Sequence, residues 1–279
     1  MNILSFGHHE LKNRYCFKGV LELASPLRIT SGVASAETDA PFVRSFDGAP
    51  YIPGSSLRGA IRSEVERILG AVGSSAGLRS CILFEKGKDG EENDERIDCA
   101  VKFRKRRREL DQDEGLTGEK RDQAMKDFIE RKLCDTCRLF GCTEFASKLV
   151  FQDCFPVDAT GIGEHCRIRD SVGIDRDTGA ASDGAKYDYE VIEGANGCPA
   201  FQFEMTAENV GERETRMVNL VLVVLRMGLT VGGKRAAGFG RIRLRDRCVV
   251  TGFDDVNAMW KALAAGGDPH GPVTWKEGV

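Results

Sequence analysis

Three of the ten cysteines lie close together in the sequence with the spacing of a metal knuckle. Cys134 and Cys137 are separated by two residues, so the turn between them would direct both thiolates at one ion, and Cys142 follows shortly after. Cys81 or Cys99 would supply the remaining ligand. We therefore predict structural zinc held by four of these five cysteines, in a closed site without an open position for catalysis. Buried thiols without metal are the alternative.

A second kind of chemistry, the binding of phosphate, is favoured where a helix is expected to begin. Pro53 disfavours a helical conformation before it, Gly54 permits a tight turn, and Ser55 or Ser56 can cap the first free amides. These amides, the helix dipole and Arg58 one turn later would stabilise a phosphate. The alternative is a capped amphipathic helix with solvated arginines.

Residues 232–240 contain four glycines around two cations, Lys234 and Arg235. Glycines let backbone amides approach a phosphate closely, and the two cations add positive charge. No Lys-Ser or Lys-Thr pair follows the glycines, so this is not a Walker loop and we predict no nucleotide hydrolysis. The alternative is a glycine-rich connection with solvated cations.

Hydrophobic periodicity predicts the elements that must position these residues. Alternating apolar residues indicate strands near residues 15–23, 148–153, 201–206 and 242–244, and three-to-four spacing indicates helices at 56–69 and 217–225. The order strand, helix, strand, strand, helix, strand is the split plan of ferredoxin-like (RRM-like) domains. We therefore predict an α+β fold of this class, which many unrelated functions share.

Between these elements lie segments of a different character. Residues 24–50 are expected to form a long loop, and dense charge of both signs marks an inserted segment at about 81–142 that contains the cysteines. The insertion is expected to be helical at about 117–133 and mobile around 87–95. Its basic run, residues 102–108, would either follow RNA phosphates or form a solvated helix face. The tail, residues 253–279, is expected to hold one short helix at about 256–264.

Composition limits the possible functions. The net charge of −3 requires that any RNA-binding charge be concentrated on one surface. The four histidines argue against a ribonuclease that uses histidine as acid and base. No apolar run approaches membrane-spanning length and no N-terminal signal pattern is present, so we expect a soluble cytoplasmic protein.

Five segments together resemble the RAMP superfamily of CRISPR proteins, in the order typical of that family. They are residues 29–43 with the lone Asp39, 51–62, 139–153, 172–190 and 232–240, and the resemblance covers about residues 15–247. Within the superfamily, the chain is most similar to the repeated backbone subunit of type III effector complexes. That subunit lines a guide RNA and cuts the paired target RNA.

The resemblance implies roles for particular residues. Asp39 would be catalytic, with Mg²⁺ or a similar cation, in attack of a target 2′-hydroxyl on its adjacent phosphate. Residues at about 166–192 would form a thumb-like β-hairpin that distorts the guide–target duplex beside Asp39. Many relatives carry serine at Cys142, which leaves open a zinc site made by the other four cysteines. The implied RNA contacts are Ser55, Ser56, Arg58, Arg62, Arg176, Lys234 and Arg235.

The resemblance also implies partners and an overall organisation. A single RAMP domain over residues 1–252 would bind guide RNA, complementary target RNA, other CRISPR effector subunits and further copies of itself, in antiviral defence. Three alternatives remain: a structural backbone subunit that does not cleave, a stand-alone RAMP endoribonuclease that processes guides, and a zinc-stabilised ferredoxin-like interaction domain. The carboxylate of Asp39 is the feature that distinguishes a cleaving from a non-cleaving subunit.

Overall fold

A six-stranded sheet forms the centre of the computed structural model, which describes residues 10–72, 75, 77–82, 97–194, 199–268 and 270–276. The strand order is β2-β5-β1-β7-β6, and every pairing is antiparallel. The bounds are β1 (Arg14–Leu23), β2 (Leu149–Phe151), β5 (Ala200–Glu208), β6 (Leu229–Thr230) and β7 (Arg241–Leu244). A further strand, β8 (Val249–Phe253), pairs with the first half of β1. The four strands expected from periodicity are present in this sheet, whereas β6 and β8 were not predicted.

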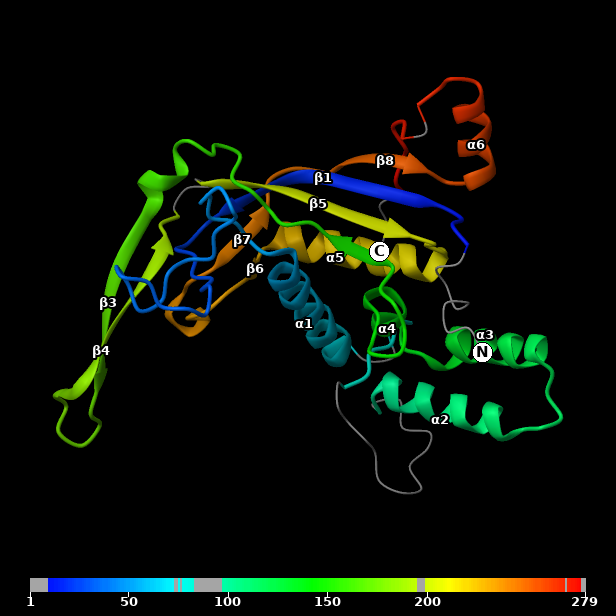
Figure 1. Cartoon of the computed structure of the whole chain (residues 1–279), viewed down its shortest axis with the longest axis horizontal. Helices are drawn as coiled ribbons and strands as arrows, with labels where there is room; N and C mark the ends of the chain where they lie inside the picture. The colour runs from blue at the N-terminus through cyan, green and yellow to red at the C-terminus, as the bar shows by residue number, and fades with distance from the viewer. Residues whose placement is uncertain are drawn as a thin grey trace.

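Two helices, α1 (Gly54–Val72) and α5 (Glu212–Met227), cover the same face of the sheet (Figure 1). Leu57 and Ile61 of α1 are fully buried, as are Val221 and Leu225 of α5, because their spacing places them on one side of each helix. They pack with alternate strand residues such as Phe17 in one continuous apolar core. The predicted sequence of strands and helices is therefore present as a mixed α/β structure.

The inserted segment forms its own small core beside the main one. It contains α2 (Cys99–Gln112), α3 (Gly118–Lys132) and α4 (Asp135–Phe140), and the predicted mobile section at 87–95 lies outside the described residues. Phe103 and Leu110 of α2 pack with Met125 and Ile129 of α3. The basic run lies on α2, where it forms ion pairs with acidic neighbours: Arg104 with Glu144, Arg106 with Glu109, and Arg107 with Asp111.

The strands β3 (Cys166–Ile174) and β4 (Ala181–Ile192) form a separate hairpin, preceded by the 3-10 helix η3 (Ile162–His165). The hairpin projects from the end of the molecule opposite α2 and α3 (Figure 1). Ile168, Val172 and Ile174 are all exposed along β3. The base of the hairpin joins the core, where Ile192 is buried and forms a bridge with Leu27.

The tail contains α6 (Val256–Ala264) at the predicted position, and the chain then returns to the core. Trp275 packs edge-on against Tyr15 and Phe17, at centroid distances of 4.8 and 5.0 Å. Its indole Nε1 donates to Oδ1 of Asn219 on α5 at 2.7 Å. Residues 271–276 therefore contribute to the core, although their only regular pairing is one isolated bridge between Pro272 and Thr251. None of the helices in the described part of the chain combines the length and hydropathy needed to cross a bilayer.

Candidate RNA interface and metal centre

Asp39 lies against the hairpin, although 149 residues separate it from its partner Asp188 on β4. The N–H of Asp39 donates to Oδ1 of Asp188 at 2.9 Å, and the N–H of Asp188 donates to Oδ2 of Asp39 at 3.1 Å. Hydrogen bonding from Thr38, and then from the Asp39 amide, lowers the pKa of the Asp188 carboxyl. Asp39 is exposed and Asp188 is half-buried, so two carboxylates meet near the surface where the long loop passes the hairpin.

The loop follows β4 beyond this pair. The N–H of Glu190 donates to the carbonyl of Ala40 at 3.0 Å, and the N–H of Phe42 donates to the Glu190 carboxylate at 2.8 Å. Arg44 forms an ion pair with the same carboxylate. The position of Asp39 relative to the hairpin is therefore held by several contacts.

Lys234 points at the hairpin from the glycine-rich loop, which contains the short 3-10 helix η4 (Arg235–Ala237). Its ammonium donates to Oγ of Ser171 and to Oη of Tyr187, both at 2.9 Å, and lies 4.0 Å from the ring centroid of Tyr189. Arg235 is exposed. Of the two cations predicted to contact phosphate, one is therefore engaged within the protein and the other is free to meet a ligand.

The glycines of this loop allow close contact with protein backbone. A Cβ on Gly232 would lie 2.2 Å from the carbonyl oxygen of Arg28, and one on Gly240 would lie 1.9 Å from that of Val231. Both glycines have positive φ angles, 82° and 81°. The glycine pattern, which we interpreted as space for phosphate, therefore also serves the packing that holds Lys234 in place.

Aromatic rings and cations gather at the base of the hairpin. Arg28 lies 4.9 Å from the ring centroid of Tyr189, and Arg169 lies 5.2 Å from that of Phe239. Tyr187 and Tyr189 alternate with Asp188 along β4, so their side chains point to the opposite side of the strand from the carboxylate. We call Arg28, Tyr187, Tyr189 and Lys234 the tyrosine cluster; Tyr189 is buried within it. The cluster was not predicted, although the alternation of Tyr187 and Tyr189 with acidic residues is visible in the sequence.

The start of α1 differs from the expected capping arrangement. The helix begins at Gly54, so Ser55 and Ser56 lie within its first turn. The carboxylate of Asp153, two residues after β2, accepts the N–H of Gly54 at 2.8 Å. The carboxylate of Asp153, which is distant in the sequence, therefore caps the helix where a hydroxyl of Ser55 or Ser56 was expected to do so. Ser55 is exposed and Ser56 is half-buried, and their role as RNA contacts remains a prediction.

Arg58 and Arg62 are directed at the end of α4. Arg58 donates to the carbonyl of Phe140, and Nη1 of Arg62 donates to that of Gly141 at 2.9 Å. Both guanidinium groups line a pocket of about 360 Å³ together with Cys142. The two arginines therefore have protein partners, and their predicted RNA contact is untested. Arg176 lies apart from them, exposed in the turn of the hairpin.

Four of the five candidate cysteines meet in the insertion: Cys81, Cys99, Cys134 and Cys137. Their sulfurs all lie within 4.8 Å of one another and all four residues are buried. A tetrahedral zinc site with Zn–S bonds of about 2.3 Å has sulfurs about 3.8 Å apart, so these residues fit a metal ion such as zinc. Cys142 is half-buried and is not part of this group.

Backbone amides already point at these sulfurs. The N–H of Cys137 donates to Sγ of Cys134 at 3.3 Å, and the N–H of Cys134 donates to Sγ of Cys99 at 3.2 Å. Hydrogen bonding among the four groups lowers the pKa of the Cys81 and Cys134 thiols and raises the pKa of the Cys99 and Cys137 thiols. The two backbone amides donate to the sulfurs of Cys99 and Cys134, a contact that suits thiolate, the form of cysteine that binds metal.

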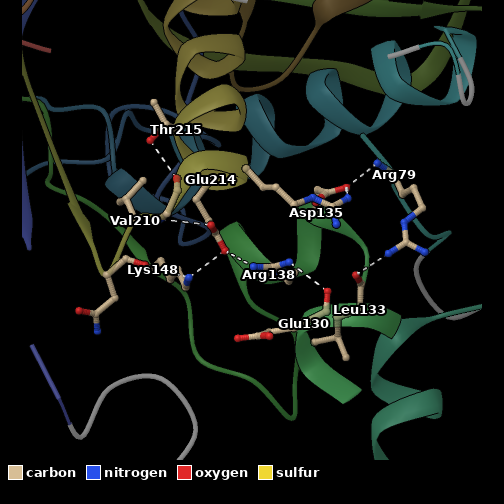
Figure 2. A network of polar contacts seen from close by, with 12 residues as sticks. Arg79, Glu130, Leu133, Asp135, Arg138, Lys148, Val210, Glu214 and Thr215 are labelled. Carbon is tan, nitrogen blue, oxygen red and sulfur yellow. Dashed lines mark hydrogen bonds and ion pairs between the residues drawn. The ribbon is translucent and has the colours of Figure 1, made fainter. Parts of the chain in front are cut away.

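A network of buried charges attaches α4, which carries Cys137, to the main core, and Figure 2 shows its polar contacts. The carboxylate of Asp135 accepts the N–H of Arg79 at 2.7 Å and pairs with Arg213 at 3.0 Å. Glu214 on α5 pairs with Arg138 at 2.7 Å and with Lys148 at 2.9 Å. Because α4 carries Cys137, these pairs hold one end of the cysteine group against α5 and the residue before β2.

The projecting hairpin, with the partly exposed ring of Tyr187 on β4, and the exposed Arg235 give this α/β protein a surface suited to nucleic acid. The model of the RAMP superfamily matches residues 20–243, which is most of the chain, so the chain belongs to the RAMP superfamily. Membership indicates a CRISPR-associated RNA-binding protein. No curated protein gave a significant match.

Proposed function

We propose that the chain is a guide-RNA-binding backbone subunit of a type III CRISPR effector complex and that it cleaves guide-paired target RNA. The observation that carries this proposal is the reciprocal pair of hydrogen bonds between Asp39 and Asp188, which joins the candidate catalytic loop to the hairpin. A ferredoxin-like core belongs to the same proposal. It is supported by the order of strands and helices and by the position of β5 between β1 and β2.

The surface near the hairpin suits RNA in two ways. Exposed Arg235 can contact phosphate, and the partly exposed ring of Tyr187 can stack on a base. The exposed aliphatic residues Ile168 and Val172 lie on the projecting hairpin, where they can press between paired bases. Such a distortion would align a target 2′-hydroxyl with the phosphate that it attacks, and alignment is the main requirement of this reaction.

The role of Asp39 is to act at the distorted nucleotide. Its Oδ2 accepts the Asp188 amide, which leaves Oδ1 to meet a ligand. An exposed carboxylate beside a half-buried one suits a hard cation, and Mg²⁺ held by Asp39 and Asp188 would stabilise charge on the phosphate and the leaving oxygen. The hydrogen bonds to β4 keep the Asp39 carboxylate at one position relative to the hairpin, and therefore relative to the cut.

The cysteine group has a structural part in this proposal. Cys81, Cys99, Cys134 and Cys137 would hold Zn²⁺ in a closed site, and their burial supports a role in folding the insertion.

The experiment that tests the proposal compares wild type with Asp39→Asn in assembled guide complexes, at matched target binding and with Mg²⁺. Asparagine keeps an oxygen that can accept the Asp188 amide but removes the charge, so the loop should stay in place. We expect target cleavage to fall by about 100-fold or more. Asp47→Asn is the matched control, because Asp47 is exposed in the same loop and bonds only to its own turn through Ser45 and Ala49.

Equal cleavage by wild type and Asp39→Asn would refute the catalytic role. A wild type that binds guide and target without cutting would instead be a structural backbone subunit. Cutting of unprocessed guide RNA by the isolated chain would favour a guide-processing endoribonuclease.

A further inference from the structure

Arg62 reaches the cysteine group from outside the insertion. It lies on α1, and Nη2 of its guanidinium is 3.6 Å from Sγ of Cys137, within hydrogen-bonding distance for sulfur. Nη1 donates to the carbonyl of Gly141 at 2.9 Å and Nε donates to Glu66 at 2.7 Å. Its side chain is only 11% exposed. All three nitrogens of the guanidinium are therefore directed at protein atoms.

This arrangement matches a need of the proposed metal site, on which the present inference rests. Zinc bound by four thiolates carries a net charge of −2, which is costly to bury without a compensating positive charge. An arginine that donates to a ligand sulfur supplies that charge and withdraws electron density from the sulfur. Outer contacts of this kind orient metal ligands and strengthen metal binding.

The contacts of Arg62 also connect the metal site to α1. Gly141 follows α4 directly, and its carbonyl would otherwise lack a helical partner. Arg58, one turn earlier on α1, donates to the neighbouring carbonyl of Phe140. Glu66, one turn later, holds the other side of the Arg62 guanidinium. One face of α1 is thereby attached to the segment that carries Cys137.

We propose that Arg62 is a positioning residue of the metal centre, which holds the Cys137 ligand and attaches α1 to it, and is not a contact to guide RNA. This differs from the role that the family resemblance implied for Arg62. Arg235, which is exposed on the glycine-rich loop, keeps the RNA role.

The test uses the full chain loaded with Zn²⁺ or Co²⁺ and compares wild type with Arg62→Met and Arg62→Lys. Arg67→Met is the matched control, because Arg67 lies on the same helix but is exposed and pairs with Glu64. We expect one metal ion per chain and about 10-fold faster release of Zn²⁺ to a chelator from Arg62→Met. Arg62→Lys should release Zn²⁺ at a rate between those of wild type and Arg62→Met, and Arg67→Met should release it at the wild-type rate. The sulfur-to-Co²⁺ charge-transfer band should move to lower energy in Arg62→Met, since the sulfur regains electron density.

An RNA measurement separates the two possible roles. Arg235→Met should reduce the slope of log affinity against log salt concentration by about one, whereas Arg62→Met should leave that slope unchanged. Glu66→Gln gives a second variant should Arg62→Met fail to fold, and it should speed Zn²⁺ release to a smaller extent.

Several results would overturn the proposal. Unchanged metal release and an unchanged Co²⁺ band in metal-loaded Arg62→Met would refute it while leaving the zinc site intact. A reduced salt slope with normal metal release would return Arg62 to the RNA interface. A wild type that binds neither Zn²⁺ nor Co²⁺ would refute the zinc site itself, and this inference with it.

Discussion

Replacement of Glu214 by glutamine should destabilise the attachment of the cysteine group to the core. The side chain of Glu214 is 5% exposed, and those of its partners Arg138 and Lys148 are 14% and 13% exposed. Removing one member of such a buried set leaves uncompensated charge and costs about 3–5 kcal/mol. Arg138 also donates to the carbonyl of Glu130, and Lys148 to that of Asn209, so both cations keep one partner. We therefore expect the lower end, about 3 kcal/mol.

Thermal unfolding of the zinc-loaded chain measures this loss. At roughly 2 °C per kcal/mol for a chain of this size, Glu214→Gln should lower Tm by about 6 °C. Glu212→Gln is the matched control, because Glu212 lies in the same first turn of α5 but is exposed. It should change Tm by about 1 °C or less. Equal shifts for the two variants would refute the reasoning, since only Glu214 is buried between two cations.

The carboxylate of Glu214 also makes the free energy of unfolding depend on pH. Burial raises the pKa of Glu214, but the charges of Lys148 and Arg138 outweigh burial and the net shift is downward. Because the folded pKa is below the unfolded value of about 4.3, the stabilisation is complete above that pH and is lost as pH falls through the folded pKa. The difference in unfolding free energy between wild type and Glu214→Gln should therefore be constant at neutral pH and shrink below about pH 4. A difference that grows on acidification would contradict the assigned direction.

Two further predictions concern the glycine-rich loop. Gly240→Ala should cost more than about 2 kcal/mol in urea unfolding, because it combines a positive φ with a Cβ 1.9 Å from the Val231 carbonyl oxygen. Gly238→Ala shares the positive φ but has open space around it and should cost about 1 kcal/mol, so similar losses would disprove the steric argument. Lys234→Met should speed amide hydrogen exchange in β3 and β4 while Arg235→Met should not, because Lys234 bonds to Ser171 and Tyr187 of the hairpin and Arg235 is exposed. Equal exchange in both variants would show that Lys234 does not hold the hairpin.

Local sequence patterns determined much of the fold. The apolar spacing of α1 and α5 and the alternation in β1 and β5 were sufficient to predict these elements, because burial of one face imposes a regular period. The helix at Val256–Ala264 matched its predicted bounds. The predicted serine cap of α1 was wrong, because the acceptor for Gly54 comes from Asp153, far along the chain.

Cysteine spacing likewise indicated metal chemistry, since two ligands of a knuckle are neighbours in the sequence. It left the other two ligands open, and only the tertiary structure placed Cys81 and Cys99 beside Cys134 and Cys137 and left Cys142 outside. The two additional cysteines come from segments that precede the knuckle by many residues, and no local period relates them to it.

Tertiary structure alone decided which distant polar side chains form hydrogen bonds with one another. Asp39 bonds to the amide of Asp188, Lys234 to the hydroxyl of Tyr187, and Arg62 to the sulfur of Cys137, each across a long stretch of chain. Periodicity shows which face of an element is buried, but not which distant segment covers it. Many of the acceptors are also backbone carbonyls, such as that of Gly141, which carry no signal in the side-chain pattern. The sequence by itself therefore determined the main strands and helices of the core and the kinds of chemistry available, and the packing of distant segments decided which residues share a site.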